Sequence, residues 1–246
     1  MRVVAVIPAR YQSSRLPGKP LVLIAGKSLI QRTWERTTQA LDPGCVYVAT
    51  DDDRIAQHCA GFGAQVLMTS DGCLTGTDRV HEAARQVAAD IYVNVQGDEP
   101  LLDPAVIDAV LAESRRHPDC VVNAMSAIDD DDDFRSPTVP HVVAAPDGRL
   151  LYMSRAAIPT DKEFARRDSW RQVCVYAFPP AALEEFARCE TKTPLESIED
   201  IEILRFLELG IPVQMVTVVA GSIAVDVPGD VARVEAILEA ENGARP

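Results

Sequence analysis

The chain has 246 residues, of which 47% are hydrophobic and 25% are charged, and its formal net charge is −13. This composition is typical of a globular protein with a sizeable core, and the acidic balance disfavours nucleic acid, whose binding needs a broad basic surface. No apolar run approaches the roughly 18 to 20 residues of a membrane span, and the first apolar run is too short for a signal peptide. The sequence therefore predicts a cytoplasmic protein that binds neither membranes nor nucleic acid.

Short apolar runs alternate with helical stretches along the first hundred residues. Strands are expected at 3–7, 45–50, 65–68 and 91–95, and helices at 28–41, 53–62 and 78–89. This β-α-β-α order predicts the α/β class, with a mostly parallel sheet flanked by helices.

The pattern changes after about residue 120. Apolar runs at 142–145 and 150–153 flank Asp147-Gly148, a dipeptide typical of a β-hairpin turn. The aspartates at 129–133 indicate a solvated loop rather than a metal site, because consecutive side chains diverge. Further strands are expected at 121–125, 173–178 and 213–219, and further helices at 181–188, 198–209 and 230–241. We therefore expect a single domain, 1–246, with a smaller β-rich insert at about 120–190.

The loop after the first strand, residues 8–20, carries three cations. Arg10, Arg15 and Lys19 stand among small polar residues, Gly18 and two prolines. Open α/β sheets bind ligands at the carboxyl ends of their strands. Three cations in such a loop suit a polyphosphate, so the segment predicts a nucleoside triphosphate site.

Two acids follow the strand at 91–95. In Gln96-Gly97-Asp98-Glu99, the glycine allows the backbone to approach a ligand closely. Carboxylates beside a triphosphate attract Mg²⁺, whereas the alternative is a turn with solvated acids. Asp226 stands between two valines, so its carboxylate is expected to have a specific partner, with a helix cap as the alternative.

The segment 75–79 leads into the helix expected at 78–89. Thr77 or Asp78 can cap that helix. The alternative is that the small residues and backbone amides of this segment read the edge of a base.

Six motifs occur in the order and spacing of the 3-deoxy-manno-octulosonate (Kdo) cytidylyltransferases, which the chain resembles over nearly its whole length. They are 8–20, 75–79, 94–100, Ser154-Arg155 with Ile158-Pro159, Pro194-Leu195-Glu196 with Ile198-Glu199, and Val225-Asp226. The resemblance implies a Rossmann-like fold of the nucleotide-diphospho-sugar transferase type and a homodimer. It also implies transfer of CMP from CTP to an acidic acceptor, with Mg²⁺ as cofactor and release of pyrophosphate.

The resemblance also implies roles for individual residues. Arg10, Arg15 and Lys19 match the triphosphate ligands; Thr75, Gly76, Arg79 and Gln96 match positions around the cytidine; Asp98 and Asp226 match the metal ligands. Arg10, Lys19 and Asp98 are the expected catalytic residues. On the acceptor side, within or near the insert that is also expected to mediate dimerisation, we expect Arg155, Arg171, Gln172, Tyr176 and Glu196.

Two departures from the family pattern concern the acceptor side. The family usually carries His where Gln172 stands and Gln where Ile203 stands. Fewer polar contacts disfavour a hydroxyl-rich sugar, so the expected acceptor is a small phosphonate such as phosphonoformate, or another acid other than Kdo. Kdo itself is the alternative. A further alternative is a nucleotide-binding protein without catalysis, which the retained Lys19, Asp98 and Asp226 disfavour.

Overall fold

The structure is a computed structural model that describes residues 1–13, 16–219 and 223–243. Its strands are β1 Val3–Ala9, β2 Leu23–Ile24, β3 Lys27–Ser28, β4 Val46–Thr50, β5 Gln65–Met68, β6 Ile91–Val95, β7 Val121–Ala127, β8 His141–Ala144, β9 Leu150–Ser154, β10 Trp170–Phe178 and β11 Val213–Thr217. Its α-helices are α1 Leu29–Ala40, α2 Asp53–Gly61, α3 Gly76–Ala84, α4 Pro104–Arg116, α5 Asp131–Arg135, α6 Pro180–Ala187, α7 Pro194–Glu199, α8 Ile203–Glu208 and α9 Pro228–Gly243. Two 3-10 helices span Lys19–Leu21 and Pro43–Cys45.

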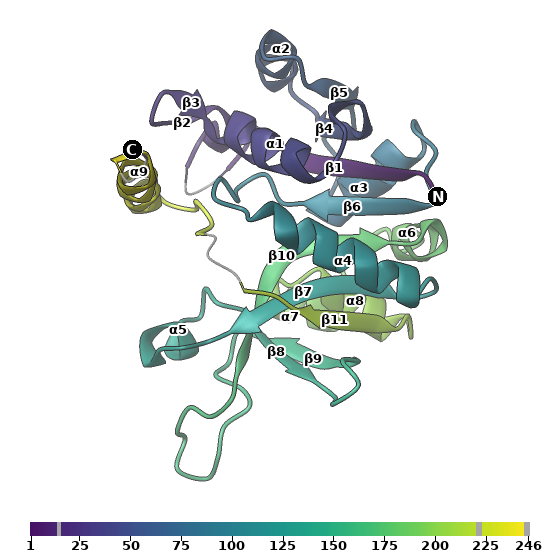
Figure 1. Ribbon diagram of the computed structural model, residues 1–246. Coiled ribbons are helices and arrows are strands. Elements are labelled where there is room, and N and C mark those ends of the chain that lie inside the picture. Colours follow the sequence, from purple (N-terminus) through teal and green to yellow (C-terminus); the bar gives the residue numbers. More distant parts are fainter. Residues whose placement is uncertain (14–15, 220–222, 244–246) are drawn as a thin grey trace.

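The main sheet has the strand order β11-β7-β10-β6-β1-β4-β5, and β8 and β9 are attached to it beside β10 (Figure 1). β1 pairs in parallel with β4 and β6, β4 with β5, and β11 with β7. β10 runs antiparallel to both β6 and β7. The predicted mostly parallel sheet is confirmed, with an antiparallel strand in its middle.

Helices cover both faces of the sheet. On one face, α1 and α4 bury Ile30 and Ile107 against the strands. On the other face, α3, α6 and α8 contribute Val80, Phe186 and Phe206. Strands buried on both faces have continuous apolar runs, and β1 and β6, predicted from such runs, are buried on both faces.

Two predictions made from local sequence are wrong. The expected helix at 198–209 is two short helices, α7 and α8, because Asp200 between them has the left-handed values φ 52° and ψ 47°. The expected loop at 129–133 contains the start of α5, whose N-cap Asp130 accepts a hydrogen bond from the Asp133 N–H (2.7 Å). Phe134, 1% exposed, buries this short helix against the protein.

The region predicted as a β-rich insert, about 120–190, is divided between two places. β7 and β10 are strands of the main sheet, whereas α5, β8, β9 and the loop before β10 project from it (Figure 1). The β8–β9 hairpin predicted around Asp147-Gly148 is confirmed by antiparallel pairing from His141 opposite Ser154. The projecting part is thus narrower than the sequence suggested.

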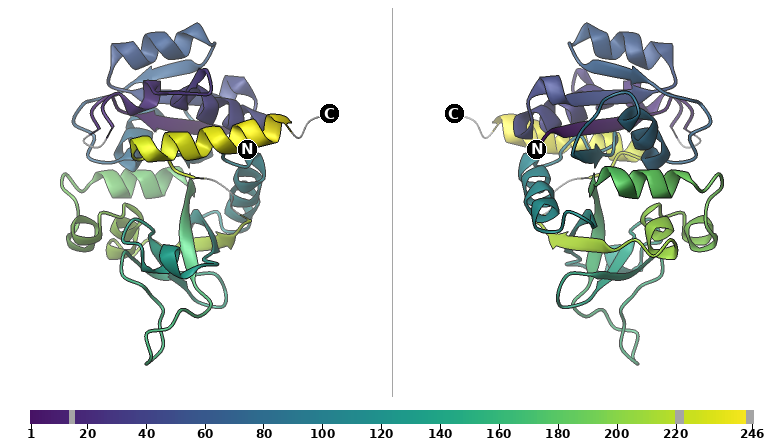
Figure 2. Two further views of the ribbon diagram at one scale, coloured as in Figure 1. Left: turned by 90° about the vertical axis from the view of Figure 1, so that its left-hand side faces the viewer. Right: turned by 90° about the vertical axis from the view of Figure 1, so that its right-hand side faces the viewer.

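The last helix returns to the amino-terminal half of the chain. α9 lies beside β2 and β3 (Figures 1 and 2), and Val234 and Leu238 pack with Ile24 and Leu29. This return brings the segment before α9, which contains Asp226, back to the loops that follow β1 and β6. Among the described residues, no helix is both long and apolar enough to cross a bilayer.

Candidate active site

A pocket of about 310 Å³ opens at the carboxyl ends of β1 and β6. Because these strands are parallel neighbours, the loops that follow them emerge at the same edge of the sheet. The pocket is lined by Pro8, Ala9, Arg10, Ser13, Lys19, Pro20, Cys73, Leu74, Thr75, Gly76, Arg79, Gln96, Gly97, Asp98, Lys192, Asp200, Glu202 and Asp226. The residues predicted to bind the nucleotide and the metal therefore all line this one pocket, apart from Arg15. Arg15 lies outside the described residues.

Two glycines allow the walls of this pocket to approach each other. A Cβ atom on Gly97 would lie 2.8 Å from the backbone oxygen of Pro8, and one on Gly76 would lie 2.8 Å from Nε2 of Gln96. Neither position has room for a larger residue without movement of its neighbours. The loops after β1 and β6 and the start of α3 therefore form one closely packed wall.

Lys19 joins the two predicted metal ligands. Its Nζ lies 2.7 Å from Oδ2 of Asp98 and 3.1 Å from Oδ1 of Asp226. Burial lowers the pKa of Lys19, but the two carboxylates raise it by more, so the net shift is upward and the ammonium stays charged at neutral pH. The Val225 N–H donates to the Asp98 carbonyl (2.9 Å), which holds the two acidic segments together.

The start of α3, which belongs to this wall, has a hydrogen-bond network of its own. Thr75 is the N-cap: its Oγ1 accepts a hydrogen bond from the Asp78 N–H (3.2 Å) and donates one to Asp78 Oδ2 (2.6 Å). The Gly76 and Thr77 N–H groups donate to the Glu202 carboxylate at 3.1 and 2.9 Å. Thr75 is therefore the cap, where Thr77 or Asp78 was expected, and the two amides considered for base reading are bonded to Glu202.

Glu202 is a half-buried acid at the amino end of a helix. Burial raises its pKa above the usual range, although the hydrogen bonds from Thr77 and Gly76 oppose this shift. A carboxylate at this end of a helix also compensates the positive pole of the helix dipole. Glu202 thus attaches α8 to α3 at the edge of the pocket.

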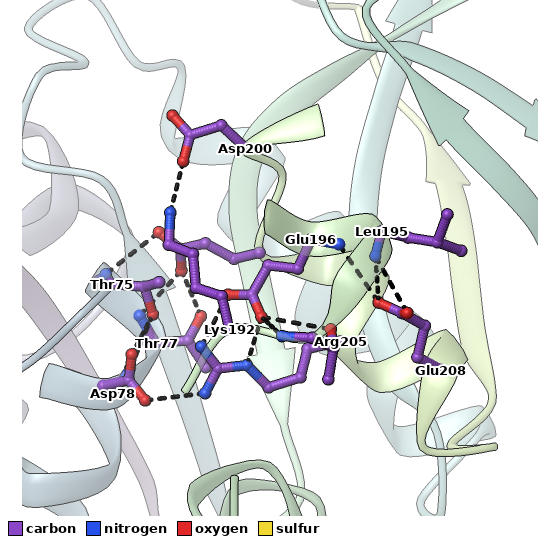
Figure 3. Close-up of polar contacts among 12 residues, drawn as sticks. Thr75, Thr77, Asp78, Lys192, Leu195, Glu196, Asp200, Arg205 and Glu208 are labelled. Atoms are coloured by element: carbon purple, nitrogen blue, oxygen red, sulfur yellow. Dashed lines mark hydrogen bonds and ion pairs between the residues drawn. The ribbon is translucent and has the colours of Figure 1, made fainter. Parts of the chain in front are cut away.

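Arg205 makes the second connection between α8 and α3 (Figure 3). It is fully buried and donates two hydrogen bonds to Glu196, from Nε (2.6 Å) and Nη2 (2.7 Å), and one from Nη1 to Asp78 (3.0 Å). Its guanidinium carbon lies 3.7 Å from the centre of the Phe186 ring. Since Asp78 also binds Thr75, this network supports the pocket wall from behind.

Arg79, predicted to lie near the cytidine, is 4% exposed and lines the pocket. Its Nη1 donates to the Thr69 hydroxyl, and its Nη2 lies 3.4 Å from the Asp51 carboxylate. The guanidinium is thus fixed by the chain that follows β4 and β5.

None of the five residues predicted for the acceptor side lines the pocket. Each of them instead contacts another part of the protein. Arg155 donates to the backbone oxygens of Glu199, Asp200 and Pro137, and Arg171 binds Asp133 (2.9 Å). Gln172 donates to Asn123 (3.0 Å), Tyr176 stacks on Phe178, and Glu196 is bound to Arg205. Their roles in acceptor binding stay predictions. Ile203, the second departure from the family pattern, is 1% exposed and belongs to the hydrophobic core.

Sequence reasoning did not identify three charged residues of the pocket, Lys192, Asp200 and Glu202. Lys192 and Asp200 form an ion pair of 2.5 Å at the pocket (Figure 3). All three lie next to α7 or α8. These two helices do not come directly after a strand, so the β-α-β pattern did not point to ligand-binding residues there. The one available signal was their closeness in sequence to the 194–199 motif.

Comparison with known proteins agrees with this geometry. A family model described as "Cytidylyltransferase" matches residues 4–215. The 3-deoxy-manno-octulosonate cytidylyltransferase of Myxococcus xanthus is 42% identical over 98% of this chain and 98% of its own length. The mitochondrial enzyme of the same name from Arabidopsis thaliana is 39% identical over 98% of this chain and 84% of its own.

Solved structures give the same result. A CMP:2-keto-3-deoxy-manno-octonic acid synthetase complexed with CTP has a TM-score of 0.91 and 36% sequence identity, and the match covers 98% of this chain and 100% of that one. A putative glucose-1-phosphate thymidylyltransferase from Bacillus anthracis, at 14% identity and a TM-score of 0.68, shares the fold. The chain thus belongs to the 3-deoxy-manno-octulosonate cytidylyltransferase family and is a nucleotidyltransferase.

Proposed function

We propose that the protein transfers CMP from CTP to Kdo and releases pyrophosphate. The observation that carries this proposal is the near full-length match, at 42% identity, to an enzyme of that name. The CTP-complexed structure with a TM-score of 0.91 supports CTP as the nucleotide. The alternative of a nucleotide-binding protein without catalysis finds no support in these relatives.

The proposed reaction is an in-line displacement at the α-phosphorus of CTP. A hydroxyl oxygen of the acceptor forms the new bond to phosphorus and gives up its proton to solvent, the bond to the bridging oxygen of the β-phosphate breaks, and pyrophosphate carries the electron pair away. Arg10 and Lys19 line the pocket and neutralise the triphosphate and the leaving group. Rate enhancement then comes from positioning and from charge stabilisation.

Asp98 and Asp226 would hold Mg²⁺. Their carboxylates converge on one cationic atom, Nζ of Lys19, and Mg²⁺ in nucleotide sites is typically held by one or two carboxylates together with phosphate oxygens. The described residues contain no group of three acidic, His or Cys side chains that could hold a metal, which fits a site completed by the nucleotide. When bound, the ion supplies charge neutralisation and polarisation of the phosphoryl group.

The expectation of a phosphonate acceptor is unconfirmed, and the comparisons favour its alternative, Kdo. The expectation depended on two departures from the family pattern, at positions 172 and 203. At position 203 the apolar residue is explained by packing, because Ile203 belongs to the hydrophobic core and is not available to a ligand. Gln172, the other departure, donates to Asn123. Phosphonoformate is therefore tested as a competing acceptor.

The test measures pyrophosphate release with CTP and Mg²⁺, in parallel reactions with Kdo, phosphonoformate and no acceptor. We expect turnover that depends on Kdo and on CTP rather than UTP or ATP. Turnover with phosphonoformate and none with Kdo would overturn the proposed acceptor. The homodimer implied by the resemblance stays a prediction, to be measured by light scattering on the same preparation.

A further inference from the structure

The charges of the described residues that line the pocket are balanced before any substrate enters. Among the described residues that line it, four basic side chains, Arg10, Lys19, Arg79 and Lys192, stand against four acidic ones, Asp98, Asp200, Glu202 and Asp226. A triphosphate and an acidic acceptor bring several negative charges to this pocket. A lining cation that already has an acidic partner therefore binds them well only when it exchanges that partner for the substrate.

The pairs differ in how firmly they are held. Lys19, 19% exposed, lies between two carboxylates, and Glu202 is held by amides of α3. Within the described part of the chain, Lys192 is paired with one carboxylate, that of Asp200, whose side chain is 71% exposed. An exposed pair of this kind contributes little to stability, because water competes for both groups. Among the lining cations that form an ion pair, Lys192 is thus the one that a substrate can take over with the smallest loss.

Asp200 stands where several cations meet. The hydrogen bond from Lys192 lowers its pKa most, and the positive charges of Lys192, Arg155 and Arg10 act in the same direction against burial. A carboxylate surrounded in this way is ionised at neutral pH and occupies a place that suits a carboxylate or phosphate oxygen of a ligand. Its backbone is fixed, since the Arg155 guanidinium donates to the Asp200 carbonyl (3.1 Å), while its side chain extends toward solvent.

We propose that Lys192 binds an anionic group of a substrate, and that Asp200 is the internal counter-ion that holds Lys192 in place until that group arrives. The proposal rests on the proposed function. The anionic group has two sources, the triphosphate of the nucleotide and the carboxylate of the acceptor, and the two share the chemistry of a charged oxygen that accepts hydrogen bonds from an ammonium. Lys192 is then a specificity-determining residue contributed by the segment before α7.

The test compares Lys192→Met, Lys192→Arg and Asp200→Asn with the wild type. Loss of a charge-assisted hydrogen bond should raise one KM by about tenfold or more in Lys192→Met, with the larger part restored in Lys192→Arg. Asp200→Asn should lower the same KM by up to about fivefold, because it removes the negative charge that competes with the substrate for Lys192. The variant is expected to keep the fold, since asparagine tolerates the left-handed backbone at this position. Lys27→Met is the matched control, since Lys27 forms a comparable exposed pair with Glu35 (2.7 Å) outside the pocket lining.

A raised KM for CTP assigns the contact to the triphosphate, and a raised KM for Kdo assigns it to the acceptor carboxylate. Unchanged KM values in Lys192→Met, or a loss of kcat with a lowered melting temperature alone, would overturn the proposal. Calorimetric binding of CTP and of Kdo to the same variants separates this result from a failure of the proposed function. A wild type that binds CTP but turns over no Kdo refutes the proposed acceptor, whereas weaker binding of CTP by Lys192→Met would still support Lys192. Binding of neither ligand by the wild type would overturn both.

Discussion

Replacement of Arg205 by Met tests how the pocket wall is supported. Arg205 and Glu196 are both 0% exposed, and they are joined by two hydrogen bonds of 2.6 and 2.7 Å. Met has a similar length and fills much of the same space, but it brings no charge and no donor. The substitution therefore leaves the Glu196 carboxylate buried and without its cationic partner.

The expected cost follows from this burial. Removal of one partner of a buried ion pair destabilises a protein by roughly 3–5 kcal/mol, because the remaining charge is uncompensated. For a chain of this length, roughly 2–4 °C of melting temperature corresponds to each kcal/mol, so we expect a decrease of about 6–20 °C. The exposed pair between Lys27 and Glu35 gives the contrast: Lys27→Met should cost no more than about 1 kcal/mol.

The assay is equilibrium unfolding in urea, with the double variant Arg205→Met/Glu196→Gln as a second measurement. Glu196 also accepts a hydrogen bond from the Thr193 N–H (3.1 Å) in a capping box, and glutamine can keep that bond. The double variant should therefore regain about 1–3 kcal/mol relative to Arg205→Met. A loss below about 1 kcal/mol in the single variant, or no recovery in the double variant, would refute the argument from an uncompensated buried charge.

Three further predictions concern the pocket and its supports. Asp98→Asn should reduce pyrophosphate release by at least about 100-fold with little change in melting temperature, and near-normal turnover would contradict the proposed metal and triphosphate site. Ile203→Gln should destabilise the protein by roughly 2–5 kcal/mol in urea unfolding without lowering the KM for Kdo; a stable variant with a lower KM would show that position 203 faces the acceptor. Burial raises the pKa of Glu199, but hydrogen bonds from Arg155, Ser154 and Tyr152 lower it by more, to below its ordinary value of 4.5. Its contribution to stability is therefore present above the unfolded-state pKa and is lost as the pH falls through the folded-state pKa, so Glu199→Gln should be less stable than wild type at pH 7 and less sensitive to acid below about pH 4.5. Equal acid sensitivity of the two proteins in urea unfolding would refute this assignment.

The sequence predicted the parallel half of the fold well because that half is built from local signals. The runs that became β1, β4, β5 and β6 are short, apolar and separated by helices, and Ser28 caps α1 as expected, accepting a hydrogen bond from the Gln31 N–H (3.2 Å). The position of β10 between β6 and β7 depends instead on pairing between segments distant in the chain. No local periodicity encodes such pairing, so its antiparallel direction could not be predicted.

The same division holds for the site. Lys19, Asp98 and Asp226 follow strand ends or turns with a recognisable pattern, and their meeting could be expected from a parallel sheet. Asp200 lies in a stretch whose apolar spacing continues from Ile198 to Leu209 and therefore predicted one uninterrupted helix. Its left-handed backbone interrupts that helix and directs the chain back to the pocket. Because apolar spacing does not reveal a single residue with left-handed backbone angles, the position of Asp200 at the pocket could not be predicted from the sequence.

The short segment around α7 and α8 connects the projecting part of the protein with the nucleotide pocket. Ser154 and the Arg155 backbone N–H, at the end of β9, donate to Glu199 at 2.7 and 2.9 Å. Three and six residues later, Glu202 and Arg205 bind the start of α3, which forms the wall of the pocket. The segment from Glu199 to Arg205 is thus held at both ends by charge-assisted hydrogen bonds. A change in the projecting part can therefore shift Asp200 and the start of α3 without contact with the nucleotide. Substitutions at Ser154 or Glu199 should therefore change the affinity for CTP as well as that for the acceptor, and an unchanged CTP affinity in Glu199→Gln would mean that α3 is held in place without this segment.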